Sequence, residues 1–408
     1  MSELTYLEKL LDGVKVEWQT LGKVLKRTKG TKITAGQMKA LHKDNAPLKI
    51  FAGGKTVAFV DFKDIPEKDI NREPSIIVKS RGIIEFEYYD KPFSHKNEMW
   101  SYHSNNDAIS IKYIYYFLKI NEGYFQKIGG KMQMPQIATP DTDKFEVPIP
   151  CPDNPEKSLA IQSEIVRILD KFTALTAELT AELNMRKKQY NYYRDQLLSF
   201  EDGEVEWKAL GTICQIGDGN HSSKYPKANE MIEQGIPFIR GTNMVNGTIC
   251  NQDMKYISKE KHNELKKGHL KAFDVLIANR GEVGKVAYVP EGYSGSNLNS
   301  QLAWLRANPE IIINRYLFFI LCSSTIQNKL SGEGGALQQL TIKNIKNIQI
   351  PVPSITVQSN IVSFLDKFDS LTNSISEGLP REIELRQKQY EYYRDLLFSF
   401  PKPETVSN

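Results

Sequence analysis

Residues 186–195 read RKKQYNYYRD, and residues 386–395 read RQKQYEYYRD. Each stretch is followed by the same dipeptide, Ser199-Phe200 after the first copy and Ser399-Phe400 after the second. A near-identical pair of this length indicates that the chain contains an internal duplication. A duplicated sequence predicts a duplicated structure, so we expect two copies of one structural unit.

Four shorter matches keep the same order along the chain, which makes the duplication secure. They pair Val16-Glu17-Trp18 with Val205-Glu206-Trp207, Ser80-Arg81-Gly82 with Asn279-Arg280-Gly281, Gly129–Gln133 with Gly334–Gln338, and Pro148-Ile149-Pro150 with Pro351-Val352-Pro353. The separation between copies varies from 189 to 205 residues, as expected of units whose loops have diverged in length. Residues 6–13 also resemble residues 193–198, so a helical fragment at the N-terminus completes a cyclic order of fragment, block, helix, block, helix.

Apolar residues recur every three or four positions in the segment that leads into each tyrosine-rich stretch. In the first copy this pattern runs from Ile161 to Phe200 and predicts one amphipathic helix of some 40 residues, roughly 60 Å long. In the second copy it runs from Val357 to Ile375 and then resumes, so Gly378-Leu379-Pro380 predicts a break. Neither helix can cover its apolar stripe alone. We expect the two to pack as an antiparallel coiled coil with an internal pseudo-two-fold repeat.

Inside the first predicted helix, residues 176–183 form the tandem tetrapeptide Thr-Ala-Glu-Leu-Thr-Ala-Glu-Leu. One interpretation is simply a run of helix-favouring residues. The other is an element that sets length, because each tetrapeptide adds about 6 Å to a helix.

Two blocks outside the helical segments are dense in short β-type runs separated by Gly, Asn and Asp turns. Each block ends in an apolar helix candidate, at residues 111–118 and 315–322. We therefore predict an α+β fold, with two α+β modules joined by two long helices. The predicted domains are an N-terminal helical segment at 1–15, a first module at 16–150, a first helical spacer at 151–202, a second module at 203–350 and a second helical spacer at 351–408.

Composition and charge suit a globular protein, with 40% hydrophobic and 25% charged residues. The net charge of +4 divides into +4 for residues 1–150, zero for 151–200, +2 for 201–350 and −2 for 351–408. Two mildly basic modules fit a polyanionic partner, although ordinary solvated surface would give the same values. The apolar runs are too short to span a membrane, the N-terminus lacks a signal peptide, and the four cysteines lie far apart. These features predict a cytoplasmic protein without a membrane partner.

Motifs for catalysis are missing from the sequence. Gly54-Lys55-Thr56 lacks the glycine that a phosphate-binding loop needs five positions earlier, where Lys49 stands. Pro140-Asp141 and Pro152-Asp153 are not followed by the Asp/Glu-x-Lys of a nuclease, and the six histidines show no metal-ligand spacing. We expect a chain that recognises rather than catalyses and binds no cofactor or metal of its own.

Two variable modules, each leading through Pro-x-Pro and an Ile-Gln or Val-Gln step into a long helix, resemble the specificity subunit of type I restriction-modification systems. The resemblance covers essentially the whole chain. Residues 235–243, 274–277 and 334–338 have the pattern of a target-recognition domain. The tandem tetrapeptide together with residues 186–195 resembles the type IC subgroup in particular.

This resemblance implies that each module reads one half of a split site in double-stranded DNA, while the helices fix the unread spacer. It implies two methyltransferase subunits that carry S-adenosylmethionine and flip a target adenine, and motor-nuclease restriction subunits that use ATP and Mg. In that family the number of tetrapeptides sets the spacer, so two copies imply the shorter of the known spacings. The two modules differ from each other, so the site is expected to be asymmetric.

Candidate DNA contacts are cations for the phosphates, and Arg, Asn, Gln or Lys for the base edges. In the first module they are Lys55, Arg81, Lys96, Asn97, Lys131, Gln133 and Gln136. In the second module they are Arg240, Asn243, Arg280, Lys285, Asn297, Asn299, Gln338 and Lys343. Arg81/Arg280 and Gln133/Gln338 recur in both copies, which a shared fold alone would also explain. The tyrosine pairs at 192/193 and 392/393 either pack between helices or form a docking surface for partner helices.

Two alternative functions remain open at this point. One is a stand-alone DNA-binding regulator or architectural protein with two reading modules. The other is a catalytic subunit whose site has diverged beyond recognition. Stable association with a methyltransferase would separate the specificity subunit from the regulator, and activity of the purified chain would identify the enzyme.

Overall fold

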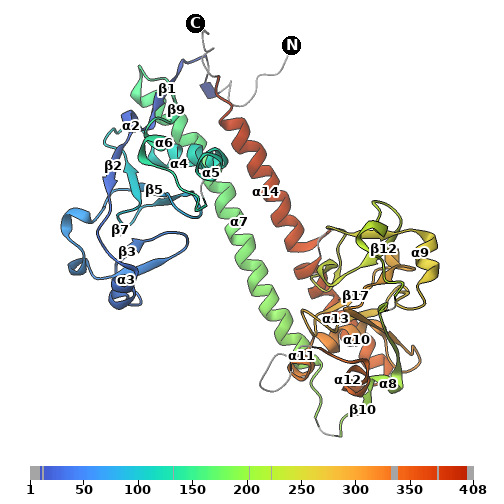
Figure 1. Cartoon of the computed structure of the whole chain (residues 1–408). Coiled ribbons are helices and arrows are strands. Elements are labelled where there is room, and N and C mark those ends of the chain that lie inside the picture. The colour runs from blue at the N-terminus through green and yellow to red at the C-terminus, as the bar shows by residue number, and fades with distance from the viewer. Residues whose placement is uncertain are drawn as a thin grey trace. The chain divides into compact units, whose positions relative to one another are not determined.

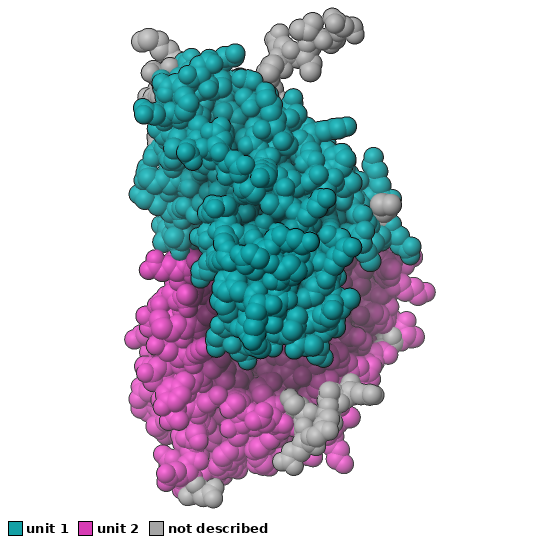
Figure 2. All heavy atoms as spheres, turned by 90° about the vertical axis from the view of Figure 1, so that its left-hand side faces the viewer, with its two compact units in different colours: residues 1–176, 386–408 teal, residues 177–385 magenta. Residues whose placement is uncertain are grey.

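The computed structural model describes residues 10–11, 13–131, 133–201, 203–221, 223–331, 339–374 and 376–401. The chain divides into two compact units, which Figure 2 shows in different colours. Unit 1 consists of residues 1–176 and 386–408, and unit 2 of residues 177–385. Each unit contains one α+β module and parts of two long helical segments, and each is described by itself below.

The first long helix, α7, runs without interruption from Pro155 to Leu197 (Figure 1). Its 43 residues correspond to a length of about 65 Å. Asn154 caps it, because its side-chain oxygen accepts a hydrogen bond from the backbone N–H of Lys157 at 3.0 Å. Proline suits the first helical position, where its missing N–H has no partner to lose. The single long helix predicted from the apolar periodicity is confirmed.

The second helical segment is broken, as the sequence predicts. α13 spans Ile355–Asn373 and α14 spans Gly378–Leu397. Gly378 has a φ of 74°, and a Cβ atom there would lie 2.4 Å from the backbone oxygen of Ser370. Only glycine fits such a turn without strain. Ile375, at the end of the predicted apolar pattern, lies outside the described residues.

In unit 1, three sheets build the first module. β1 pairs antiparallel with β9, a four-stranded sheet has the order β2-β8-β5-β6, and a three-stranded sheet has the order β4-β3-β7 with β3 and β7 parallel. The strands are β1 (Val16–Thr20), β2 (Lys26–Lys29), β3 (Leu48–Phe51), β4 (Val57–Val60), β5 (Ser75–Lys79), β6 (Glu85–Tyr89), β7 (Phe93–His95), β8 (Trp100–His103) and β9 (Glu146–Pro150). The helices are α2 (Leu21–Val24), α3 (Ala35–Leu41), α4 (Ile111–Ile120), α5 (Glu122–Gly129) and α6 (Thr139–Asp143).

In unit 2, the second module repeats this topology strand for strand. β10 pairs with β20, the four-stranded sheet has the order β11-β19-β16-β17, and the three-stranded sheet has the order β15-β12-β18 with β12 and β18 parallel. The strands are β10 (Glu206–Ala209), β11 (Cys214–Asp218), β12 (Ile236–Ile239), β15 (Lys255–Ile257), β16 (Val275–Ala278), β17 (Val286–Tyr288), β18 (Asn297–Leu298), β19 (Leu302–Ala307) and β20 (Gln349–Val352). The helices are α8 (Leu210–Ile213), α9 (Lys259–Glu264), α10 (Asn314–Cys322), α11 (Ser324–Ser331) and α12 (Ile342–Asn347).

The second module also has a small hairpin of β13 (Met244–Val245) and β14 (Thr248–Ile249). Asn246 and Gly247 connect these strands, both with positive φ, as a tight two-residue hairpin turn requires. Apart from this addition, the shared strand order confirms the predicted internal repeat and the α+β class.

A buried glutamine fixes each module to its long helix. The Gln162 side chain of α7 accepts a hydrogen bond from the Ser110 N–H at 2.9 Å and donates to the Ala108 oxygen at 2.9 Å. In unit 2, Gln358 of α13 accepts from the Ile313 N–H at 2.9 Å and donates to the Ile311 oxygen at 3.0 Å. Both glutamines are fully buried. They are the Gln residues of the Ile-Gln and Val-Gln steps in the sequence.

A tyrosine on the apolar helix of each module reaches the Pro-x-Pro strand. The hydroxyl of Tyr113 in α4 donates to the Pro148 oxygen at 2.8 Å, and that of Tyr316 in α10 donates to the Pro351 oxygen at 3.1 Å. Proline has no N–H for strand pairing, yet its carbonyl still accepts a hydrogen bond. The two modules therefore hold their closing strand in the same way.

Aromatic rings pack between the helical segments inside each unit. In unit 1, Phe172 of α7 stacks on Tyr393 of α14, with ring centroids 5.4 Å apart. In unit 2, Tyr193 of α7 packs against Phe368 of α13 at 5.7 Å. Their neighbours in sequence, Tyr192 and Tyr392, are 61% and 65% exposed. One tyrosine of each pair thus packs against a helix and the other faces solvent, while regular coiled-coil packing stays a prediction.

We predict that replacing a buried glutamine destabilises its unit. Gln358→Leu removes the partners of one buried N–H and of the Ile311 and Pro353 carbonyls. The expected loss is about 2–4 kcal/mol of unfolding free energy, because each unpaired buried polar group costs about 1–3 kcal/mol. Calorimetric thermal unfolding measures it. Gln349→Leu, at an exposed position of β20, is the matched control, and equal melting temperatures for the two variants would contradict this role.

Candidate nucleic-acid interface

In unit 1, several candidate residues gather where strands end. β3 and β7 are parallel, so their carboxyl ends meet at one edge of the sheet. Lys55 lies in the hairpin after β3, whereas Lys96 and Asn97 follow β7. The backbone N–H of Lys96 donates to the Phe51 oxygen at 2.9 Å and ties the two ends together. We call this region of each module the recognition edge.

Arg81 joins the recognition edge of unit 1 from the end of β5. The Ser80 hydroxyl donates to the Glu98 oxygen at 2.7 Å, which holds the end of β5 beside the segment that follows β7. Arg81 pairs with Gln136 in an isolated antiparallel bridge. The next residue, Gly82, has a φ of 74°, and no atom lies within 4 Å of the place where a Cβ atom would stand. The turn therefore leaves the Arg81 side chain exposed.

A carboxylate lies among these cations. Glu98 forms an ion pair with Lys96, at 2.6 Å between Oε1 and Nζ. Partial burial by itself would raise the pKa of the Glu98 carboxyl, but the hydrogen bond from Lys96, a hydrogen bond from the Glu98 backbone N–H and the positive charges of Lys96 and Arg81 together outweigh it. The pKa of Glu98 consequently lies below its ordinary value, and the group is ionised at neutral pH.

The recognition edge of unit 2 is built in the same way. The backbone N–H of Asn299 donates to the Ile239 oxygen at 2.9 Å, and that of Asn279 donates to the Gln301 oxygen at 2.9 Å. Arg280 pairs with Gln339 in an isolated antiparallel bridge. The structure thus brings the two recurring arginines to equivalent positions, each followed by a glycine with positive φ and each facing a glutamine.

The candidates differ in exposure. Exposed candidates are Lys55, Arg81, Asn97, Lys131, Gln133, Arg280 and Lys343. Partly buried candidates are Lys96, Gln136, Arg240 and Lys285. Among these, Lys285 pairs with Glu282 at 2.5 Å, and the Arg240 guanidinium donates to the Asp253 oxygen at 2.6 Å. Lys131 and Gln133 lie in the same loop as Gln136, and Lys343 lies on α12.

Three of the candidate asparagines are buried, which the sequence did not indicate. Asn243 is fully buried: its Oδ1 accepts from the Arg240 N–H at 3.1 Å, and its Nδ2 donates to the Gln252 oxygen at 3.0 Å. Asn297 is fully buried beside His262, and Asn299 is 5% exposed. Asn243 therefore shapes the loop after β12 instead of facing solvent. A short polar side chain in a loop satisfies backbone groups as readily as it binds a ligand.

Gln338 lies outside the described residues. The structure instead places three polar residues at the recognition edges that sequence reasoning missed: Glu98, Gln301 and Gln339. Gln301 and Gln339 lie far from Arg280 along the chain, and separation in sequence does not indicate which residues are in contact. The residue type of Glu98 gives no signal for DNA binding, because a carboxylate carries the same charge as the phosphates.

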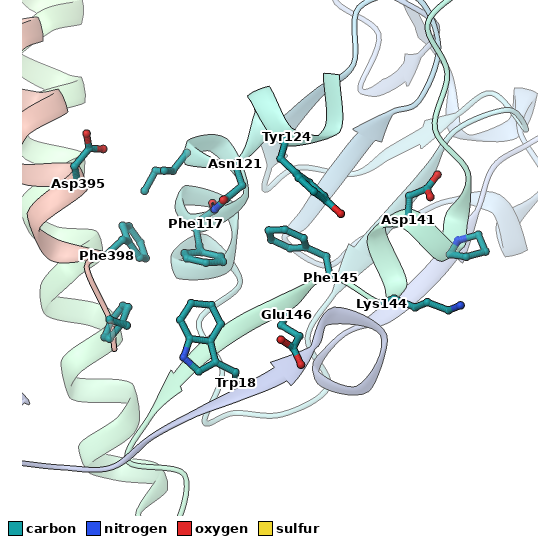
Figure 3. Close-up of a pocket in the computed structure, with 13 residues that line it drawn as sticks. Trp18, Phe117, Asn121, Tyr124, Asp141, Lys144, Phe145, Glu146, Asp395 and Phe398 are labelled. Carbon is teal, nitrogen blue, oxygen red and sulfur yellow. The ribbon is translucent and has the colours of Figure 1, made fainter. Parts of the chain in front are cut away.

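A separate hollow of about 710 Å³ lies in unit 1, where the tail of the chain meets the first module (Figure 3). Trp18 of β1 donates from Nε1 to the Pro401 oxygen at 2.9 Å, and Phe398 packs against Phe117 of α4. Figure 3 shows these rings gathered with Phe145 and Tyr124. The lining residues also include Asp141, Lys144, Glu146 and Asp395, without a histidine, cysteine or hydroxyl nucleophile beyond the tyrosine. None of the candidate DNA contacts lies there.

The described residues were also considered for a metal site and for a membrane-spanning helix. No group of three or more His, Cys, Asp or Glu side chains within the described ranges is arranged to hold a metal ion. No helix within those ranges is long and apolar enough to cross a bilayer.

The model of one protein family, the type I restriction modification DNA specificity domain, matches the chain twice, at residues 15–186 and 203–385. The chain belongs to this family. It is 44% identical to the EcoR124I/EcoR124II specificity subunit of Escherichia coli, over 100% of both chains. It is 36% identical to the EcoprrI specificity subunit of Escherichia coli, over 92% of this chain and 93% of the relative.

A solved structure supports the fold. The type I restriction-modification S subunit from M. genitalium matches with a TM-score of 0.61 at 17% identity, over 96% of this chain and 98% of that one. Family membership confirms the predicted specificity subunit, favours it over a stand-alone regulator, and classes the chain as a recognition component rather than an enzyme. The type IC subgroup stays a prediction.

We predict that Asn243 and Arg280 respond differently to alanine. Asn243→Ala leaves backbone groups of a buried loop without partners and should lower the unfolding free energy by about 1–3 kcal/mol. Arg280→Ala removes an exposed side chain and should change it by less than about 0.5 kcal/mol. Urea unfolding of both variants measures the difference. If Asn243→Ala were as stable as the wild-type chain, its assignment to the loop interior would be wrong.

Proposed function

We propose that this chain binds an asymmetric, two-part site in double-stranded DNA, with one half read at the recognition edge of each unit. The observation that carries the proposal is the repeated edge itself. In both units an exposed arginine, followed by a glycine with positive φ and bridge-paired with a glutamine, lies just after the equivalent strand, β5 or β16. The side chains around it differ, with Lys96 and Glu98 in unit 1 where unit 2 has Asn299 and Gln301.

Elementary chemistry supports this assignment. Exposed Lys and Arg side chains neutralise phosphates and position the protein, whereas Arg, Asn and Gln form paired hydrogen bonds with base edges. The recognition edges offer cations for the phosphates and Arg, Asn and Gln side chains for the bases, on short turns held by backbone hydrogen bonds. Because the arginine is common to both edges and its neighbours are not, the two edges suit different base sequences.

We further propose that the chain directs partner subunits that supply the chemistry. Two methyltransferase subunits would carry S-adenosylmethionine and methylate adenine, and motor-nuclease restriction subunits would use ATP and Mg. This chain would bind no cofactor itself and would act in the cytoplasm. The exposed Tyr192 and Tyr392 rings are candidates for contacts with partner helices. The two tetrapeptides in α7 would specify the shorter spacer between the half-sites.

The first test of this function is a methylome. The chain is expressed with its neighbouring methyltransferase in cells that lack such a system, and the DNA is sequenced for N6-methyladenine. We expect a single two-part motif with a fixed spacer, absent when the gene for this chain is omitted. Soluble, associated subunits that leave no motif would contradict the proposal and favour the stand-alone DNA-binding alternative.

Binding to the DNA site should weaken steeply with salt, because neutralising phosphates releases counterions. Lys55→Gln should reduce the slope of log K against log salt by roughly one, the expected loss for one phosphate contact. The matched control is Lys144→Gln, which removes an exposed lysine from the hollow of Figure 3 instead of the recognition edge. Fluorescence anisotropy with a short duplex measures both slopes, and a salt-independent affinity of the wild-type complex would exclude DNA binding of this kind.

A further inference from the structure

Strand register identifies one pair of equivalent positions beside the recurring arginines. Val78 of β5 pairs with Trp100 of β8, and the equivalent Ile277 of β16 pairs with Ala303 of β19. Two residues before these partners stand Glu98 and Gln301. The backbone oxygen of each accepts a hydrogen bond from the residue that precedes the arginine, Ser80 in unit 1 and Asn279 in unit 2. Glu98 and Gln301 therefore occupy equivalent positions, in the turns that precede β8 and β19.

These equivalent side chains have nearly the same shape but different hydrogen-bonding capacity. An ionised glutamate only accepts hydrogen bonds, whereas a glutamine amide both donates and accepts. The Glu98 carboxylate is ion-paired with Lys96 at one oxygen and also accepts a hydrogen bond from its own backbone N–H, which leaves about two of its roughly four lone-pair sites. Gln301 is exposed. Each side chain thus retains capacity for a further partner at its recognition edge.

We propose that this position determines base specificity, with Glu98 accepting a hydrogen bond from N4 of a cytosine and Gln301 pairing with N6 and N7 of an adenine. The inference rests on the proposed function, since it names residues that would read the two half-sites. In the major groove, cytosine presents an N4 donor that a carboxylate accepts, and adenine presents the donor and acceptor that an amide matches. Two units with one topology would in this way prefer different bases.

The cations around Glu98 support this assignment. A bare carboxylate would repel the phosphates, but Lys96 forms an ion pair with Glu98 and compensates its charge locally. The positive charge of Arg81 also acts on the carboxylate, in the same direction as Lys96. The competing explanation is that Glu98 only positions Lys96 through their ion pair. The two explanations differ in outcome, because loss of an ion-pair partner changes affinity for every sequence, whereas loss of a base contact changes preference at one position.

The experiment compares two reciprocal substitutions in the chain co-expressed with its methyltransferase partner. Glu98→Gln should shift one position of one half-site from cytosine toward adenine, by roughly ten-fold or more in relative preference, as expected for one paired base contact. Gln301→Glu should shift one position of the other half-site in the opposite direction. The methylated motif gives the preferences. Selection of randomised half-sites by the purified complex gives them again without requiring methylation.

Asp107→Asn is the matched control, because this exposed carboxylate follows β8 at the end opposite to Glu98. It should leave every position of the motif unchanged. An unaltered motif in Glu98→Gln, or equal weakening for all sequences at an unchanged unfolding temperature, would overturn the assignment. Absence of any motif with the wild-type chain would instead contradict the proposed function itself, so the two failures are distinguishable.

Discussion

A buried glutamine near the start of each helical segment anchors its module to that helix. Gln162 and Gln358 each satisfy a backbone N–H and a backbone carbonyl in the loop that enters the apolar helix of their module. An unpaired group in that interior would be costly, so the glutamine fixes where the module lies on its helix. The apolar helix then places the four-stranded sheet, and the sheet places the recognition edge.

This arrangement separates the constant part of each unit from its variable part. The glutamine, the helix tyrosine that donates to the Pro-x-Pro strand and the aromatic pair between helices recur in both units. At the recognition edges the arginine–glutamine bridge recurs, together with the glycine of positive φ after the arginine and the backbone hydrogen bond to the end of β3 or β12. The neighbouring side chains change in charge and hydrogen-bonding capacity. Loop residues on a rigid scaffold can vary without loss of the core, so one topology carries two different sets of side chains at this edge.

The candidate site was predicted in part. Arg81 and Arg280 were found because their motifs recur, and the structure places both at equivalent, exposed turns. Asn243 and Asn297 were chosen by residue type alone, and both are buried. Side-chain chemistry is local, but burial depends on which distant segments pack above a loop. For the same reason Gln301 and Gln339 could not be connected with Arg280 from the sequence.

The duplication, the α+β class, the uninterrupted α7 and the break before α14 can all be predicted from the sequence alone. Repeated motifs indicate the duplication, whereas the other features depend on periodicity, glycine and proline, whose effects act within a few residues. The folded structure was needed to show which tyrosine of each pair packs against a helix, which candidates reach solvent, and that Glu98 and Gln301 occupy equivalent positions. Those facts follow from strand register and from contacts between residues far apart in the chain, and local sequence patterns do not encode them.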